Sequence, residues 1–134
     1  MPLRVLVVDD SPVMRLAIQR VIDLSCLPLK CFTAQHGNAA LSLLKDQEID
    51  LMLVDLNMPG MGGCDLVRRM QSEPGERQIP FIVISADATQ TRMQEMLDLG
   101  ALAYIPKPFA PALLRSEMAN ALNQIQPGEN HVCN

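Results

Sequence analysis

Aromatic residues are scarce in this chain of 134 residues, which has three Phe, one Tyr and no Trp. Its apolar residues nevertheless make up 49% of the sequence. Any core must therefore be filled by Leu, Ile, Val, Met and Ala, a composition that suits helices layered on an aliphatic sheet. The length fits one domain and is sufficient to bury a core.

The chain also lacks an excess of basic residues and long apolar runs. Its formal charge is −4 and its pI about 5.0, which argues against a nucleic-acid-binding surface. No apolar run approaches the ~20 residues needed to span a bilayer. The first residues lead directly into a predicted strand, so we expect no signal peptide. These observations predict a cytoplasmic protein that by itself binds neither nucleic acid nor membrane.

The four cysteines, at positions 26, 31, 64 and 133, include no Cys-x-x-Cys pair. This spacing is not typical of a zinc site. We expect reduced thiols, two or three of them packed in the core. His36 and His131 are expected to be exposed residues without a ligand role.

Short apolar segments alternate with helical patterns five times. The expected strands are residues 4–8, 29–34, 51–54, 81–84 and 103–105, and the expected helices are 12–24, 38–45, 65–70, 89–99 and 110–125. In the first helix the apolar stripe is Val13, Leu16, Ala17, Val21 and Leu24. Because the strands lack polar alternation, both of their faces should be covered, which predicts an α/β fold with a parallel sheet and helices on both sides. A polar C-terminal tail is expected over 127–134, after a domain of residues 1–126.

Polar residues follow the strands at their carboxyl ends. They are Asp9, Asp10, Asp55, Ser85 and Lys107. In parallel α/β sheets such ends share one crevice. Converging carboxylates repel one another, and Mg²⁺, which prefers oxygen ligands, would resolve this. A Ser hydroxyl and a Lys ammonium can hold phosphoryl oxygens, and an Asp can act as the nucleophile that forms an aspartyl phosphate.

Several motifs at these positions occur together: Val-Leu-Val-Val-Asp-Asp-Ser ending at Ser11, Asp-Leu-Asn-Met-Pro-Gly-Met-Gly-Gly ending at Gly63, Ile-Ser-Ala ending at Ala86, and Lys107-Pro108-Phe109. As a set they are highly specific. From residue 4 to about 125 the chain resembles the receiver domains of bacterial two-component response regulators. The resemblance implies the flavodoxin-like five-stranded sheet of order 2-1-3-4-5.

The resemblance also implies roles for individual residues. Asp55 would be the phosphoacceptor, and Ser85 and Lys107 would hold the phosphoryl oxygens. Asp10 and Asp55 would bind Mg²⁺, with Asp9 acting largely through water and the main-chain carbonyl of Asn57 completing the site.

A second group of implied features concerns switching. Ser85 and Tyr104 would rearrange on activation, and a cis peptide bond would join Lys107 to Pro108. The phosphoryl group would come from a sensor histidine kinase or a phosphotransfer protein. A protein target would bind the face formed by residues 89–99, 103–105 and the start of 110–125. The domain would be a signalling module rather than an enzyme, either a stand-alone regulator of the chemotaxis type or a receiver from a longer protein.

Three alternatives remain at this point. A haloacid-dehalogenase-like phosphatase also uses an Asp after a strand, but it needs an acid two residues later, where this chain has Asn57. A nucleotide-binding α/β domain would need Gly-x-Gly-x-x-Gly after the first strand, and this motif is missing. A receiver-like interaction module that is not phosphorylated is the third.

Overall fold

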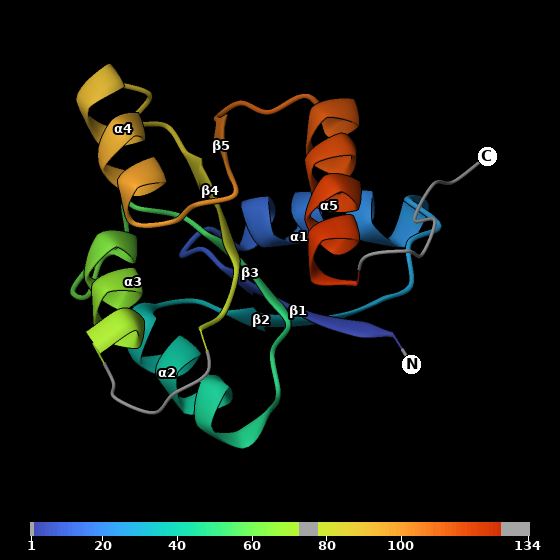
Figure 1. Ribbon diagram of the computed structural model, residues 1–134, viewed down its shortest axis with the longest axis horizontal. Coiled ribbons are helices and arrows are strands. Elements are labelled where there is room, and N and C mark those ends of the chain that lie inside the picture. The colour runs from blue at the N-terminus through green and yellow to red at the C-terminus, as the bar shows by residue number, and fades with distance from the viewer. Residues whose placement is uncertain (1, 73–77, 127–134) are drawn as a thin grey trace.

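The computed structural model describes residues 2–72 and 78–126, so the expected tail at 127–134 lies outside the described residues. Strands and helices alternate along the chain (Figure 1). The strands are β1 (Leu3–Val8), β2 (Leu29–Ala34), β3 (Leu51–Val54), β4 (Phe81–Ser85) and β5 (Ala103–Pro106). The helices are α1 (Pro12–Leu24), α2 (Gly37–Asp46), α3 (Gly63–Ser72), α4 (Gln90–Asp98) and α5 (Pro111–Ile125).

The five strands form one parallel sheet of order β2-β1-β3-β4-β5, which confirms the predicted topology. Every residue of β3 and β4 is buried, as their apolar sequences require, and the one polar residue among them is Ser85 at the end of β4. β5 lies at an edge, where the missing N–H of Pro106 is tolerated.

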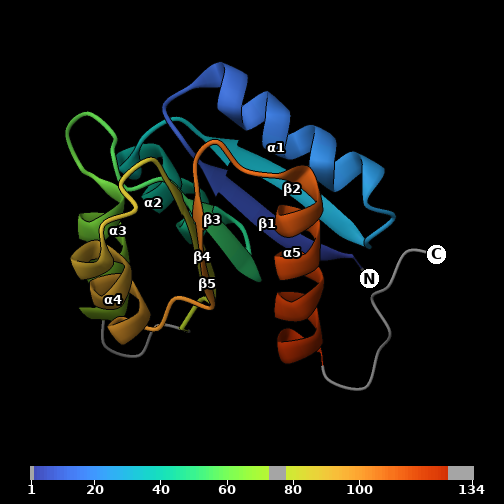
Figure 2. The ribbon, with the colours of Figure 1, turned by 90° about the horizontal axis from the view of Figure 1, so that it is seen from above.

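Helices cover both faces of the sheet (Figure 2). On one face, α1 and α5 pack over side chains such as Val7, Leu53 and Ile84. On the other face, α2, α3 and α4 pack over Leu6, Met52 and Val83. The register explains this division, because successive residues of a strand point to opposite faces of the sheet.

The apolar stripe that predicted helix α1 is not the side of the helix that is buried. The helix begins as predicted, with Ser11 as N-cap accepting a hydrogen bond from the Met14 amide at 3.2 Å and Pro12 in the first turn. Its buried residues, however, are Ile18 and Ile22. Of the five predicted positions, Val13, Leu16 and Leu24 are exposed, Val13 at 77% and Leu24 at 78%, and Ala17 and Val21 are half-buried. The helix carries apolar residues on two sides, and periodicity alone does not decide which side meets the sheet.

Other expectations differ in smaller ways. α3 begins at Gly63 and ends at Ser72, each two residues beyond the predicted bounds, and every other boundary agrees with the prediction or shifts by one residue. Cys31 and Cys64 are free and half-buried, but Cys26 is disulfide-bonded, so reduced thiols were a wrong expectation there. Cys26 lies in an exposed turn after α1 with a φ of 61°, not in the core. Cys133 and His131 lie outside the described residues.

No helix among the described residues is long and apolar enough to cross a membrane.

Candidate functional site

Backbone hydrogen bonds align the carboxyl ends of the strands. The Asp9 amide donates to the carbonyl of Ala34 at 3.1 Å, and the Asp55 amide donates to the carbonyl of Val8 at 2.9 Å. Between β4 and the edge strand β5, the Lys107 amide donates to the carbonyl of Ser85 at 2.9 Å. The sheet thus delivers the residues that follow β1, β3 and β5, with Ser85 at the end of β4, to one edge.

Lys107 joins two of the carboxylates. Its Nζ donates to Asp9 Oδ2 at 2.9 Å and lies 3.3 Å from Asp55 Oδ2. Asp9 and Asp55 are almost inaccessible, at 1% and 4% exposed. A buried carboxylate needs a partner, and this one ammonium group serves both.

Asp9 is fixed from other directions too. Its Oδ1 accepts a hydrogen bond from the Ser11 amide at 2.9 Å, and its carbonyl accepts one from Arg15 Nη1 at 2.6 Å. Asp9 is therefore a rigid part of the site, whereas neighbouring Asp10 is exposed.

The three carboxylates form a group suited to a cation. One oxygen from each of Asp9, Asp10 and Asp55 lies within 4.8 Å of the others. Lys107 contributes one positive charge against three negative charges, so an excess of negative charge remains at this edge. Mg²⁺ prefers hard oxygen donors such as these carboxylates, and the exposed Asp10 keeps one of them open to solvent. The residues present fit the predicted ion.

Burial and the neighbouring charges shift the pKa values of both Asp55 and Lys107. Burial raises the pKa of Asp55, and the charge of Asp9 adds to the rise, while the Asn57 amide at 3.3 Å and Lys107 act against it. Burial alone would lower the pKa of Lys107. The hydrogen bond to Asp9 and the charges of Asp55 and Asp9 outweigh burial, so the pKa of Lys107 is raised. The ammonium is thus firmly charged beside the buried carboxylate.

Ser85 and Tyr104 both contact the loop after β4. Ser85 Oγ accepts a hydrogen bond from the Asp87 amide at 3.1 Å. The Tyr104 hydroxyl donates to the Asp87 carbonyl. Ser85 is fully buried and Tyr104 is half-buried. Asp87 therefore connects the two predicted switch residues.

The loop after β3 approaches Asp55 closely. A Cβ at Gly63 would lie 2.3 Å from the Asp55 carbonyl oxygen, so a residue with a side chain does not fit there. Across the site, the peptide bond between Lys107 and Pro108 is cis, as predicted. Both loops that border the site thus depend on particular backbone geometry.

A cavity of about 430 Å³ opens beside Asp10. Its walls come from the start of α2 and from the loop after β3, and include Gln35, His36, Asn38 and Met61. His36 is exposed, as expected, and its Nδ1 caps α2 by accepting from the Ala39 amide at 3.1 Å. Of the three carboxylates, Asp10 is the one that lines this cavity.

The sequence profile of the response regulator receiver domain matches residues 5–119. The chain belongs to the response regulator receiver family. Its site residues lie at the sheet edge where the family resemblance led us to expect them.

Individual relatives agree with this assignment. The chain is 32% identical over 117 residues to the chemotaxis protein CheY-3 of Vibrio cholerae, covering 87% of this chain and 88% of that protein. It is also 32% identical over 128 residues to the cyclic di-GMP phosphodiesterase response regulator RpfG of Xanthomonas campestris, but spans only 34% of that protein's length. The structure of CheY4 of Vibrio cholerae superposes with a TM-score of 0.79 at 25% identity, over 90% of this chain and 99% of that one.

The structure brings together all of the predicted polar residues at one edge. Asp9, Asp10, Asp55 and Lys107 meet directly. Asp87 was missed from the sequence, although an Asp two residues after Ser85 in a short loop is a common turn signal. Arg15 was given no role from the sequence, because its contact is with the main-chain carbonyl of Asp9.

Proposed function

We propose that Asp55 accepts a phosphoryl group in a Mg²⁺-dependent reaction and that the domain thereby switches a protein-binding face. The observation that carries this proposal is the contact of the buried Asp55 carboxylate with Lys107 at 3.3 Å, inside a group of three carboxylates. Membership of the response regulator receiver family supports it.

The reaction needs little beyond these groups. A carboxylate oxygen of Asp55 forms a bond to phosphorus as the bond from phosphorus to the donor breaks, and the donor leaves with that electron pair. Lys107 donates hydrogen bonds to the phosphoryl oxygens, and the Ser85 hydroxyl donates another. Mg²⁺, held by Asp10 and Asp55 directly, by Asp9 largely through water and by the Asn57 carbonyl, would supply neutralisation of the phosphoryl charge.

The donor we propose is a phosphorylated histidine on a sensor kinase or phosphotransfer protein, as the family relationship implies. The cavity beside Asp10 offers such a donor access to the acidic group. We assign residues 1–126 to this receiver domain and 127–134 to a polar tail, and place the protein in the cytoplasm on the strength of the same relationship.

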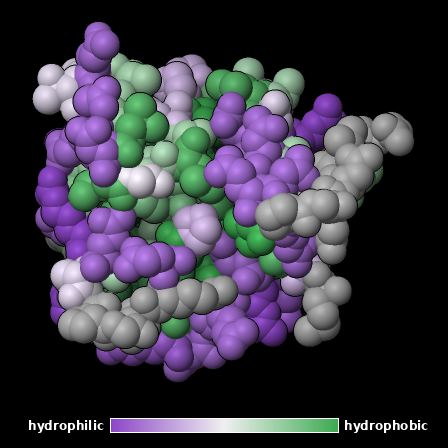
Figure 3. Space-filling model, viewed as in Figure 1, coloured by the Kyte–Doolittle hydropathy of each residue, from purple (hydrophilic) through white to green (hydrophobic). Residues whose placement is uncertain are grey.

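The binding face we propose consists of α4, β5 and the start of α5. In the view of Figure 1, this part of the surface carries hydrophobic residues in its middle, flanked by hydrophilic ones (Figure 3). Leu97 of α4 and Leu113 of α5 are exposed, and Tyr104 of β5 is half-buried. Exposed apolar residues rimmed by polar ones are typical of protein-binding surfaces.

The three other functions weighed from the sequence are less well supported. A nucleotide-binding domain lacks Gly-x-Gly-x-x-Gly after β1. A dehalogenase-like phosphatase needs a second acid where Asn57 stands, and an amide cannot act as a general acid. A receiver-like module that is never phosphorylated would have no use for three carboxylates gathered around Asp55, whereas Mg²⁺-dependent phosphoryl transfer uses all three.

Phosphorylation is tested with a small phosphodonor such as acetyl phosphate in the presence of Mg²⁺. Intact-mass spectrometry should find one added phosphoryl group, stable in acid and labile in base, on the unaltered protein and on an Asp98→Asn control. Asp55→Asn should remove it. Equal labelling of Asp55→Asn would show that another residue is the acceptor.

A further inference from the structure

Arg92 of α4 contacts three side chains: Asp87 in the loop after β4, Glu95 in α4 itself and Cys64 in α3. Its Nε lies 3.5 Å from Asp87 Oδ2, in the loop after β4. Its Nη1 lies 3.2 Å from Glu95 Oε2 and donates to Cys64 Sγ at 3.1 Å. Since Cys64 is in the first turn of α3, one guanidinium group connects the loop after β4 to the start of α3.

Asp87, at one end of this connection, contacts both predicted switch residues. Its amide donates to Ser85 Oγ and its carbonyl accepts from the Tyr104 hydroxyl. Its carboxylate accepts from the Thr89 hydroxyl at 2.9 Å through Oδ1, while Oδ2 faces Arg92. The position of Asp87 therefore affects hydrogen bonds of both Ser85 and Tyr104, whose side chains also interact directly.

Cys64, at the other end, lies next to the phosphoacceptor. It follows Gly63, where an added Cβ would lie 2.3 Å from the Asp55 carbonyl oxygen. Burial raises the pKa of Cys64, so the thiol stays neutral and serves as an acceptor for Arg92. The start of α3 thus contacts the backbone of Asp55 on one side and Arg92 on the other.

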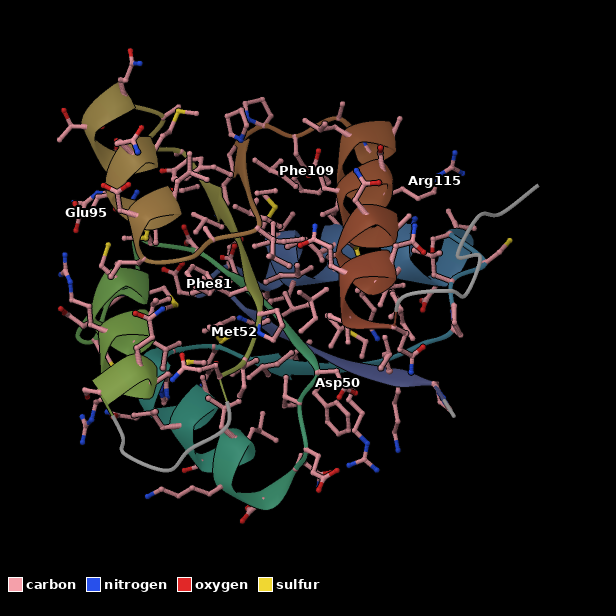
Figure 4. All side chains as sticks on the ribbon, in the orientation of Figure 1. Asp50, Met52, Phe81, Glu95, Phe109 and Arg115 are labelled. Carbon is pink, nitrogen blue, oxygen red and sulfur yellow. The ribbon has the colours of Figure 1, made fainter. Side chains whose placement is uncertain are left out.

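Glu95 strengthens the same junction. It bonds to Arg92 through Oε2 and to Arg68 of α3 through Oε1. Figure 4 shows Glu95 on α4, on the side that faces α3. Arg68 therefore shares Glu95 with Arg92. Among the described residues Arg68 makes no ion pair with Asp87, so it is a matched control.

We propose that Arg92 is a positioning residue. It holds Asp87, and through Asp87 also Ser85 and Tyr104, in a fixed position relative to the start of α3. This inference rests on the proposed function, because it concerns how the phosphorylated site controls its switch residues. Asp55 follows β3, whereas the loop that contains Asp87 follows β4. Arg92 couples a change at Asp55 to a change in the position of that loop. Without it, Ser85 can still reach the phosphoryl group, but Tyr104 no longer follows.

The first arm of the test uses the unphosphorylated full-length protein and does not depend on the proposed function. Amide hydrogen exchange at Asp87, followed by NMR, should accelerate at least fivefold in Arg92→Met. In Arg68→Met it should stay within twofold, and in Arg92→Lys, which keeps a cation beside Asp87, it should lie closer to the unaltered protein than to Arg92→Met. Unchanged exchange at Val83 and Leu53 of the core serves as the check on global stability.

The second arm adds beryllofluoride, a mimic of the acyl phosphate, with Mg²⁺. In Arg92→Met the shifts of amides next to Asp55 and Lys107 should persist, while the shift of the Tyr104 ring should fall below half its size in the unaltered protein. A merely structural role would reduce both sets of shifts together.

The proposal is overturned if Asp87 exchange is unchanged in Arg92→Met, if Arg68→Met accelerates it equally, or if the Tyr104 ring responds in full. If the unaltered protein instead shows no beryllofluoride response at all, the proposed function fails, and the exchange measurement still decides the role of Arg92.

Discussion

Lys107 and Asp9 are separated by 98 positions in the sequence, and their side chains meet at 2.9 Å. The contact joins the residue after the edge strand β5 to the residue after the inner strand β1, across the ends of β3 and β4. Lys107 also lies 3.3 Å from Asp55, so the electrostatic state of the Asp55 carboxylate depends on this pair.

Replacing Lys107 by Met should destabilise the protein by about 3 kcal/mol, because it leaves the buried carboxylates of Asp9 and Asp55 without their cation. Urea denaturation in chelator measures the free energy of unfolding. Mg²⁺ should return part of the loss, since it supplies positive charge to the same carboxylates.

Lys45 provides the control for this substitution. It lies exposed in the last turn of α2, so Lys45→Met should cost well under 1 kcal/mol. A Lys107→Met protein as stable as Lys45→Met would mean that the buried carboxylates do not need the ammonium.

Changing Asp10 to Asn should weaken Mg²⁺ binding and slow phosphoryl uptake from a small donor at least tenfold. The reason is that Asp10 contributes an exposed carboxylate to the group of three. The rise of Tm with added Mg²⁺ reports binding independently of the reaction. Asp46→Asn, an exposed change at the end of α2, should alter neither quantity. Full uptake in the presence of a chelator would contradict the metal role.

The phenol of Tyr104 should titrate above the 10.0 of an unperturbed tyrosine, because burial raises its pKa. It is the sole tyrosine of the chain, so absorbance at 295 nm reports it alone. The folded state keeps the proton at pH values where the unfolded state has lost it. Stability from this group therefore falls as the pH rises from 10.0 through the folded value.

The protein unfolded in urea is the reference for this titration. There the titration midpoint of Tyr104 should fall to the value of an unperturbed tyrosine. A midpoint that is the same in the folded and unfolded protein would show that the ring is not held against the loop after β4.

Phosphorylation should change the surface of α4, β5 and the start of α5. The phosphoryl group adds ~1.5 to 2 negative charges at Asp55. Ser85 responds first, and Tyr104 is linked to it through Asp87. NMR with and without beryllofluoride should therefore find large shifts within residues 89–109, as a shift between two populations. Tyr104→Ala should leave phosphorylation nearly intact. Shifts confined to the loop after Asp55 would exclude this output face.

The two sides of α1 should differ in their effect on stability. Ile18 is buried against the sheet and Leu16 is exposed. Ile18→Ala should cost about 2 to 5 kcal/mol through lost burial and cavity formation, and Leu16→Ala less than ~0.5 kcal/mol. Thermal or urea unfolding compares them directly. If both substitutions lower the free energy of unfolding equally, Leu16 must be buried in an interface with another molecule, which a single chain does not show.

Some of the site was predictable because it depends on local sequence. The five strands lack a regular alternation of apolar and polar residues, and this pattern with intervening helices implies a parallel sheet. A parallel sheet places the residues that follow β1, β3 and β5, and the end of β4, at one edge, so Asp9, Asp55, Ser85 and Lys107 could be grouped without coordinates.

Other features were decided only by the tertiary structure. The buried side of α1 depends on how the helix meets the sheet, and its apolar residues on two sides left that open. Asp87 and Arg92 acquire their roles from side-chain contacts with residues distant in the sequence, such as Cys64, 28 positions from Arg92. The sequence by itself determined the order of the elements and the edge at which the chemistry gathers, because strand patterning is local. Only the packed fold decided which side chains share a hydrogen bond, because such partners depend on distances that no single segment encodes.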